Sequence, residues 1–482
     1  MSFDTRTRLL AASLAVLLAG CGGDASVTAT VPVNSSDPVI DTAQIAKIDA
    51  YVEAQRTRRH LPGLALVVSM NGKPVLEKGY GLADIAKNET VTPDTVFRIG
   101  SVTKPFTAAA IMMLVQDGKL KLDDPVTRHL PAAPAAWRDI TIRHLLTHTS
   151  GLPQNFPSDV MVSMLNDPPL PMDRVVRMAA GLPRQTAPGA AYAYNNIGYH
   201  LLGFVIENVS GMPFFEFLRE RMFEPLHMNT AAMISAPLPA AAAVGYVWSG
   251  TTPRPASDWL TAPGLVEAEG GLRMSARDLA KWDAALLGGQ FLTGNSLSQM
   301  HAPARLNDGS PIRYGFGWVP DEINGQPYVW HNGELGAFKA QFVRHSAGKM
   351  SVIVLGNTDE APVEAIASRV SGIVDPALDW SVLPDPQPAL GKLVHDVVDE
   401  LRRGDLVVDD RFSPDMRAAL TPETVAVIRE TFAQWSAIES VGYLGSDTVD
   451  GVARQRYLVR DKVDEVVLSV RLDGEGRLAA FR

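Results

Sequence analysis

The residues best suited to chemistry in this sequence are Ser101 and Lys104, three positions apart at the expected start of a helix. At this spacing the two side chains share one helix face, so the lysine amine can lie beside the serine hydroxyl. A serine hydroxyl becomes a strong nucleophile only when a neighbouring group takes its proton. The helix N-terminus adds partial positive charge where an oxyanion would form. The pair predicts acyl transfer, whereas the alternative interpretation makes Ser101 an ordinary helix N-cap and Lys104 a solvated charge.

Two later segments contain further side chains that could take part in such a reaction. Tyr194 and Asn196 stand in the run Tyr-Ala-Tyr-Asn-Asn at 192–196. His331 and Gly333 stand in Val-Trp-His-Asn-Gly at 329–333, directly before Glu334. Each also has a purely structural interpretation: a half-buried tyrosine, an asparagine that caps a helix, and a histidine within a strand.

In their order and spacing these segments resemble the three active-site motifs of the serine beta-lactamase and penicillin-binding-protein superfamily. The resemblance is closest to its class C-type branch, which contains beta-lactamases, esterases and D-amino-acid peptidases. It spans roughly residues 43–372 and includes accessory strings at 144–153, 270–272 and 314–318. It implies an α/β plus all-α fold, in which helices and a helical subdomain flank an antiparallel sheet.

The resemblance also implies roles for individual residues. Ser101 would be the nucleophile, Lys104 its partner, Tyr194 the proton shuttle and Asn196 a polar contact to the substrate. We expect the Lys104 ammonium and a helix N-terminus to favour the phenolate form of Tyr194. The oxyanion hole would be formed by the backbone N–H groups of Ser101 and Glu334.

His331, two residues before Gly333, stands where many members of this superfamily carry a lysine, although histidine is familiar among the esterase-like members. A lysine there would be cationic at all working pH values and would suit a substrate carboxylate. A histidine is charged only below about its reference pKa of 6.5. We therefore expect a weaker requirement for a substrate carboxylate, and a preference for esters over penicillins.

His144 and His148 have the i, i+4 spacing of a metal-binding pair. No glutamate follows His144 as it would in an H-E-x-x-H zinc motif. Their string, Leu-Leu-Thr-His-Thr-Ser-Gly-Leu-Pro at 145–153, instead indicates a loop near the site. The sequence predicts neither a metal nor any other cofactor.

The local pattern predicts the elements that must position these residues. Apolar spacing favours helices, Asn-Gly favours a two-residue hairpin turn, and runs of β-branched residues favour strands. The expected elements are a helix over 42–58, a hairpin over 64–77 with its turn at 71–72, a helix from Ser101 to near Gly118, a helix beginning beside Tyr194, and a strand over 351–355 next to the strand of His331.

The N-terminus reads as an export signal. Arg6 and Arg8 precede an apolar run over 9–18 that is too short to span a bilayer as a helix. The run ends in Leu-Ala-Gly-Cys, which looks like a bacterial lipobox with Cys21 as the lipidated residue. The segments expected are a lipoprotein signal over 1–21 and a flexible linker over 22–41. With no aspartate after Cys21, we expect anchoring to the outer membrane, facing the periplasm; an ordinary cleaved signal is the alternative.

The C-terminal part has a different pattern. Residues 42–375 form the predicted hydrolase domain, and several prolines over 376–392 indicate a linker. Helical and then strand-like runs over 393–482 predict a small α+β domain, which looks like the cystatin or nuclear-transport-factor-like modules attached to some secreted hydrolases.

Composition narrows the class of partner. The 482 residues include 46% hydrophobic and 20% charged residues and carry a net charge of −9, without a basic run. These values fit a globular enzyme and disfavour nucleic-acid binding. The sequence therefore predicts a periplasmic serine hydrolase for small esters or amides, in contact with a membrane through its lipid. The alternatives are a D-Ala-D-Ala carboxypeptidase, D-amino-acid peptidase or beta-lactamase, and a non-catalytic sensor of cell-wall fragments or beta-lactams; no feature indicates an oligomeric state.

Overall fold

A computed structural model describes residues 39–166, 170–249, 252–256, 266–345, 349–449 and 452–481. The proposed signal, Cys21 and most of the predicted linker lie outside the described residues. The helices are α1 (Thr42–Arg58), α2 (Thr103–Gln116), α3 (Ile142–Leu146), α4 (Ser158–Asn166), α5 (Met172–Ala180), α6 (Asn196–Ser210), α7 (Phe214–Leu218), α8 (Ala276–Leu287), α9 (Gly294–His301), α10 (Val363–Val374), α11 (Pro388–Arg403), α12 (Pro414–Ala419) and α13 (Pro422–Phe432).

The strands begin close behind the first helix. They are β1 (Gly63–Met70), β2 (Lys73–Asp84), β3 (Glu89–Thr90), β4 (Val96–Arg98), β5 (Ala232–Met233), β6 (Tyr246–Ser249), β7 (Thr252–Pro255), β8 (Leu272–Ser275), β9 (Val319–Ile323), β10 (Gln326–Glu334), β11 (Lys339–His345), β12 (Met350–Gly356), β13 (Ser440–Val449), β14 (Val452–Arg460), β15 (Glu465–Leu472) and β16 (Leu478–Phe481).

The main sheet has seven strands in the order β3-β2-β1-β12-β11-β10-β9, and its neighbours pair antiparallel. The first and last parts of the hydrolase segment therefore meet at its centre, where Leu66 of β1 is opposite Val354 of β12. A short sheet of order β4-β8-β5 leads directly into the predicted nucleophile.

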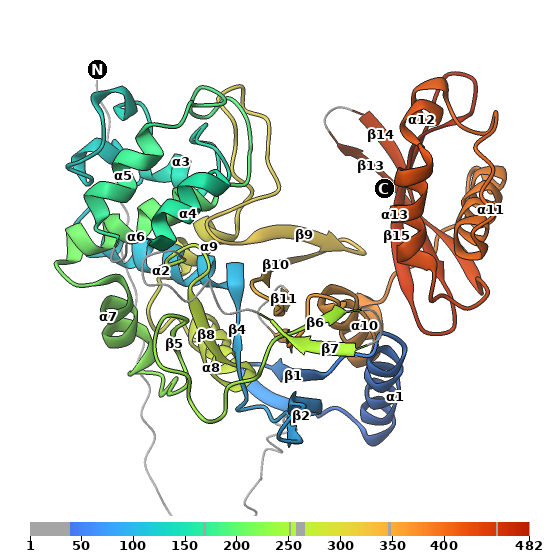
Figure 1. The fold of residues 1–482 in the computed structure, drawn as a ribbon, viewed down its shortest axis with the longest axis horizontal. Coiled ribbons are helices and arrows are strands. Elements are labelled where there is room, and N and C mark those ends of the chain that lie inside the picture. Colours follow the sequence, from blue (N-terminus) through green and yellow to red (C-terminus); the bar gives the residue numbers. More distant parts are fainter. Residues whose placement is uncertain are drawn as a thin grey trace, which may run out of the picture. The chain divides into compact units, whose positions relative to one another are not determined.

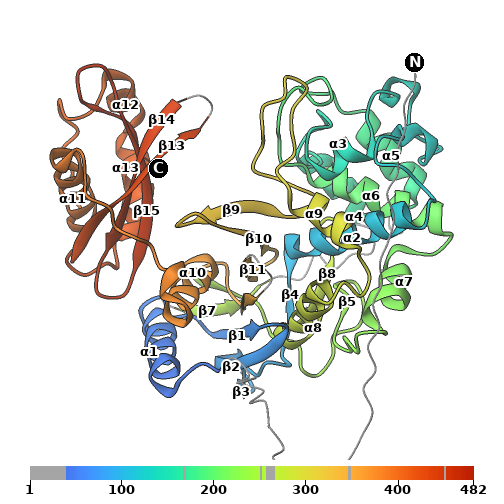
Figure 2. The same cartoon turned by 180° about the vertical axis from the view of Figure 1, so that it is seen from behind.

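Helices cover both faces of the main sheet (Figure 1). On one face α1 and α10 pack together, and α10 lies over β11 and β12; on the other, α8 lies over β1 and β12. In the view from behind, the helices α2 to α6 lie together above α8 and form the helical region (Figure 2). The α/β plus all-α arrangement predicted from the sequence is confirmed.

Local chemistry explains why the first elements form where the sequence predicts them. Asp41 caps α1: its side chain accepts from the Gln44 N–H at 2.7 Å, and the Gln44 side chain accepts from the Asp41 N–H at 3.1 Å. The β1–β2 turn places Asn71 at φ +53° and Gly72 at φ +75°, as a type I′ turn requires.

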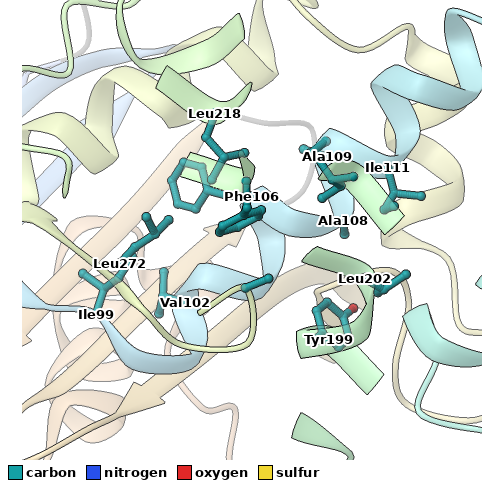
Figure 3. Packing of buried hydrophobic residues seen from close by; sticks show 14 of the residues in the cluster. Ile99, Val102, Phe106, Ala108, Ala109, Ile111, Tyr199, Leu202, Leu218 and Leu272 are labelled. Carbon is teal, nitrogen blue, oxygen red and sulfur yellow. The ribbon is translucent and has the colours of Figure 1, made fainter. Parts of the chain in front are cut away.

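Helix α2 lies at the centre of the hydrophobic core, between the main sheet and the other helices of the helical region. Its residues from Thr103 to Leu114 are all buried. Figure 3 shows Phe106 facing Leu218, with Val102 and Ile99 close to Leu272. The helix is therefore held rigidly by apolar packing along its length, and it ends before Gly118, which has φ +69°.

One expectation about strand order was wrong. The strand predicted over 351–355 exists as β12, but β11 lies between it and the strand of His331. The Lys339–His345 segment was not recognised as a strand because Lys, Gln, Arg and His interrupt its apolar pattern. Both faces of β11 are covered, so Gln341, Arg344 and His345 are buried, and alternation is not visible in the sequence.

The C-terminal segment has a hydrophobic core of its own, formed by α11, the segment that follows it and a four-stranded antiparallel sheet of order β13-β14-β15-β16. Helix α11 begins within the stretch predicted as a linker, because Pro388 occupies the first helical turn, where its missing N–H costs nothing. Among the described residues no single helix is long and apolar enough to span a membrane; only the bent pair Asn196–Ser210 and Phe214–Phe223, at 72°, passes that test of length and composition together.

Candidate active site

Ser101 lies in a 3₁₀ turn, Gly100–Val102, which joins β4 to α2. The N-cap position of α2 belongs to Val102 and not to Ser101. The turn requires φ +50° at Gly100, which favours glycine. Ser101 is partly exposed, whereas Lys104, one turn along, is fully buried. The local geometry therefore presents the hydroxyl to a cavity and keeps the amine beneath it.

The Lys104 amine is held by acceptors from three separate segments. Its Nζ lies 3.0 Å from Ser101 Oγ, 2.8 Å from Asn196 Oδ1 and 2.7 Å from the backbone oxygen of Glu269. Burial lowers the pKa of Lys104 to about 7, although the Glu269 carboxylate acts to raise it. A lysine with this pKa is present as a neutral base in about half of the molecules near neutral pH.

Tyr194 lies directly before α6, and its ring is 4.8 Å from Lys104 Nζ. Burial raises the pKa of Tyr194, while a hydrogen bond with Ser101 lowers it in part. The expected phenolate is therefore wrong: Tyr194 is a neutral phenol that can donate or relay a proton. Desolvation of the buried ring favours the neutral phenol and outweighs the effect of the nearby positive charge on which the expected phenolate rested.

Asn195 and Asn196 have different tasks. Asn195 is the N-cap of α6, and its side chain accepts from the Gly198 N–H. Asn196 is the first residue of the helix and contacts Lys104. The structure therefore assigns the capping role to Asn195 and leaves the Asn196 side chain facing the lysine.

His331 on β10 is buried and neutral. Its Nε2 lies 3.0 Å from Tyr314 Oη, and its Nδ1 lies 2.6 Å from the backbone oxygen of Asn332. Burial, and secondarily the charge of Lys104, lower the pKa of His331 to about 3. This position therefore presents no positive charge to a substrate.

The end of β10 closes against the Ser101 turn. A Cβ at Gly333 would lie 1.9 Å from Ile99 O and 3.0 Å from Ser101 N. A Cβ at Gly100 would likewise lie 2.7 Å from the backbone nitrogen of Glu334. Only glycines permit this approach, which brings the backbone at Ser101 and Glu334 together, where the oxyanion hole is expected.

A cavity of about 180 Å³ opens beside Ser101. Gly100, Asn196, His200, Glu269, Gly270 and Glu334 contribute to its lining. Its apolar wall is formed by Phe156, Met161, Met164, Ile197, Val266 and Leu335. No lysine or arginine is among the described lining residues, so the cavity suits an apolar acyl group better than an anionic one.

The structure also places beside Tyr194 and Lys104 three residues that were not predicted to contact the reacting groups. The centroid of the His148 ring lies 4.3 Å from that of the Tyr194 ring, at a tilt of 37°, and burial holds the pKa of His148 well below its usual value. His200 and Glu269 form a buried pair at 3.1 Å, separated by 69 positions in the sequence. The sequence features that could have indicated this pair are a histidine one helical turn after Asn196 and a carboxylate directly before Gly270.

The two histidines considered as a metal pair serve the backbone instead. His144 Nδ1 accepts from the Thr141 N–H at 3.2 Å, and His148 Nδ1 accepts from the Asn195 N–H at 2.9 Å. Within the described ranges, no group of three or more His, Cys, Asp or Glu side chains is arranged to hold a metal ion.

An antiparallel sheet flanked by helices, with a serine and a buried lysine where a strand meets the central helix, is the arrangement typical of the beta-lactamase and penicillin-binding-protein superfamily. The family model described as Beta-lactamase matches residues 48–371, and the chain belongs to that family.

Two relatives show how far the similarity extends. Protein flp of Staphylococcus aureus (strain COL) is 28% identical over 335 residues, 67% of this chain and 65% of its own length. The chain thus spans about 65% of that relative. Penicillin-binding protein 4* of Bacillus subtilis (strain 168) is 29% identical over 347 residues, 64% of this chain and 73% of its own length.

Solved structures share the fold. The octameric penicillin-binding protein homologue from Pyrococcus abyssi has a TM-score of 0.60 at 21% identity, covering 89% of this chain and 96% of its own. The D-amino acid amidase from Ochrobactrum anthropi SV3, complexed with L-phenylalanine amide, has a TM-score of 0.59 at 25% identity, covering 70% and 98%.

Proposed function

We propose that this chain hydrolyses small esters or amides through an acyl-enzyme on Ser101. The observation that carries the proposal is the 3.0 Å contact between Lys104 Nζ and Ser101 Oγ, with the amine buried enough to be a neutral base. The cavity beside Ser101, with its apolar wall and no lysine or arginine among the described lining residues, supports a neutral acyl group.

The reaction proceeds in two balanced steps. Lys104 takes the Ser101 proton as Oγ bonds to the acyl carbon, and the backbone N–H groups of Ser101 and Glu334 stabilise the oxyanion. As the bond between the acyl carbon and the leaving group breaks, the proton passes to the leaving alcohol or amine through the Tyr194 hydroxyl. A water molecule next attacks the acyl carbon and loses its proton to the same groups. The acid is released and Ser101 recovers its proton.

A second candidate is the cleavage of D-amino-acid amides or peptides. It is favoured by the likeness to a D-amino acid amidase, at 25% identity over 70% of this chain. The lower demand for a carboxylate at His331 argues against penicillins as preferred substrates. A sensor that acylates without turnover is the remaining alternative.

The test compares the full chain, purified in detergent, with its Ser101→Ala variant. We expect steady hydrolysis of p-nitrophenyl butyrate and labelling by a fluorophosphonate, both lost in Ser101→Ala. Ser158→Ala, an exposed serine at the start of α4, is the matched control and is expected to behave as the wild type. Turnover of D-alanyl amides but not esters would favour the second candidate. Labelling without turnover of either would favour the sensor.

We also propose that the chain is a lipoprotein, anchored through Cys21 and facing the periplasm. The proposal rests on Arg6 and Arg8, the apolar run over 9–18 and the lipobox-like sequence that ends at Cys21. Fractionation of expressing cells tests it: we expect the wild type with the outer membrane and a Cys21→Ser variant released from it. Equal solubility of the two proteins would contradict the anchor.

A further inference from the structure

A buried ion pair, Glu269 with His200, lies beside the reacting groups and has no role in the steps above. His200 Nδ1 lies 3.1 Å from Glu269 Oε1, and the two side chains are 3% and 11% exposed. The other carboxylate oxygen of Glu269 accepts from the Glu267 N–H at 3.1 Å. Burying two ionisable groups costs free energy, so a pair placed next to the Lys104 amine is a candidate for a role in the reaction.

The pair is joined to Lys104 by a closed ring of contacts. Asn196 and His200 are four residues apart on α6, so they share one helix face. Asn196 Oδ1 accepts from Lys104 Nζ at 2.8 Å, and His200 contacts the Glu269 carboxylate. The backbone oxygen of Glu269 returns to Lys104 Nζ at 2.7 Å. A change of charge in the pair therefore acts on the amine over a short, desolvated path.

The Glu269 segment is fixed along α2 from both sides of Lys104. Thr107 Oγ1 donates to Ala268 O at 2.6 Å, and the Leu272 N–H donates to Thr103 Oγ1 at 3.2 Å. These contacts hold the Glu269 carbonyl against the amine. A substitution of the Glu269 side chain therefore leaves the contact between the Glu269 carbonyl and Lys104 in place, because the neighbouring contacts hold the backbone.

The ionisable groups around the amine differ in charge. His148 and His331 face Lys104 as neutral imidazoles, because burial lowers the pKa of both. Burial acts to lower the pKa of His200, but Glu269 raises it above its ordinary value. Three hydroxyl groups lie near the amine, those of Ser101, Tyr194 and Tyr199. Two further carboxylates, Glu207 and Glu267, act on His200.

We propose that Glu269 and His200 form a charge pair that sets the protonation state of Lys104 and thereby the pH range in which Ser101 is acylated. Both are positioning residues that act through Lys104, and the inference rests on the proposed function. The carboxylate holds a proton on the amine, and the imidazolium partly cancels that effect. The two residues therefore have opposite effects on the protonation of Lys104. A purely structural role would not produce effects of opposite sign.

The experiment measures the rate at which a fluorophosphonate labels Ser101 in the full chain, between about pH 5 and about pH 9, a range that brackets the ordinary and lowered pKa values of the site. In Glu269→Gln the carboxylate charge is gone, so Lys104 loses its proton more easily. We expect the midpoint of the profile to fall by about one pH unit. His200→Asn keeps an N–H donor but carries no charge, and its midpoint is expected to rise.

Two controls separate charge from shape. Glu269→Asp retains the carboxylate and is expected to keep the midpoint near that of the wild type. Asp159→Asn removes an exposed carboxylate on α4 and is expected to move nothing. Labelling yield and thermal melting of each variant establish that it is folded.

Midpoints that move in opposite directions in Glu269→Gln and His200→Asn support the inference. Unmoved midpoints, shifts in the same direction, or a Glu269→Asp profile equal to that of Glu269→Gln overturn it while the proposed function stands. Absence of any Ser101-dependent labelling in the wild type overturns the proposed function, and the inference with it.

Discussion

At the residue scale, His331 fixes the charge near the end of β10, two residues before the Gly333 backbone that closes against the Ser101 turn. It is buried, neutral and hydrogen-bonded to Tyr314, so a carboxylate on the substrate gains no ion pair from it. Cationic partners make stronger hydrogen bonds to carboxylates than neutral ones. Within the proposed function, this one side chain is therefore the position at which a preference between neutral and carboxylated substrates can be tested.

We predict that His331→Lys increases the preference for carboxylated over neutral substrates. A hydrogen bond to a charged group contributes about 1.5–3 kcal/mol, so the ratio of kcat/KM values is expected to rise about tenfold or more. His331→Gln, which stays neutral, is the matched control. Equal ratios in His331→Lys and the wild type, from paired esters with and without a carboxylate, would contradict the prediction.

The candidate site was predictable to the extent that its chemistry is local. Ser101 and Lys104 share one helix face, and this spacing is visible in the sequence. The His200–Glu269 pair was not visible, because it joins two segments 69 positions apart. The charge state of Tyr194 was predicted incorrectly, because the pKa depends on burial that only the packed structure defines.

At the scale of elements, α8 is joined to the main sheet by a buried charge. The Asp283 carboxylate accepts from Arg344 Nε of β11 at 2.6 Å and from Ser351 Oγ of β12 at 2.8 Å. The side chains of Asp283 and Arg344 are 4% and 5% exposed. One carboxylate thus holds a helix and two central strands together.

Replacing this carboxylate should destabilise the fold more than replacing an exposed one. Asp283→Asn leaves the Arg344 guanidinium buried without its counter-charge, which costs about 3–5 kcal/mol. The matched control is Asp123→Asn, whose partner Arg143 and own side chain are 40% and 73% exposed; its expected cost is about 0–1 kcal/mol. Denaturant unfolding of both variants measures the difference. Equal free energies of unfolding would refute the role of Asp283.

Elements whose signals are local were predicted closely. The helix over 42–58 and the turn at Asn71–Gly72 were found as expected, since a cap and a turn are encoded by adjacent residues. The insertion of β11 between β10 and β12 was not expected, because strand order depends on pairing between distant segments. In the C-terminal part, Gly442 and the bulge near Gly445 weaken the strand pattern of β13, so its bounds are not visible in the sequence.

At the scale of the whole molecule, the buried lysine bears on the stability of the fold as well as on catalysis. In the unfolded chain Lys104 would have an ordinary pKa, whereas burial lowers it to about 7 in the folded chain. The unfolded state therefore binds the proton more tightly. The resulting penalty is greatest below about pH 7 and disappears above about pH 10.5, so this group makes stability rise with pH between these values.

The consequence is a trade between activity and folding. The full penalty is at most on the order of 5 kcal/mol, comparable with the net stability of many domains. An inactive Lys104→Met variant should be freed from it, in part offset by the acceptors left without a donor. We expect the variant to have the higher free energy of unfolding near neutral pH. This advantage over the wild type is expected to shrink as pH rises from neutral toward 10. A difference that does not vary with pH would show that the lysine exerts no such cost. A difference that does vary would show that removing the buried amine relieves the fold of this penalty.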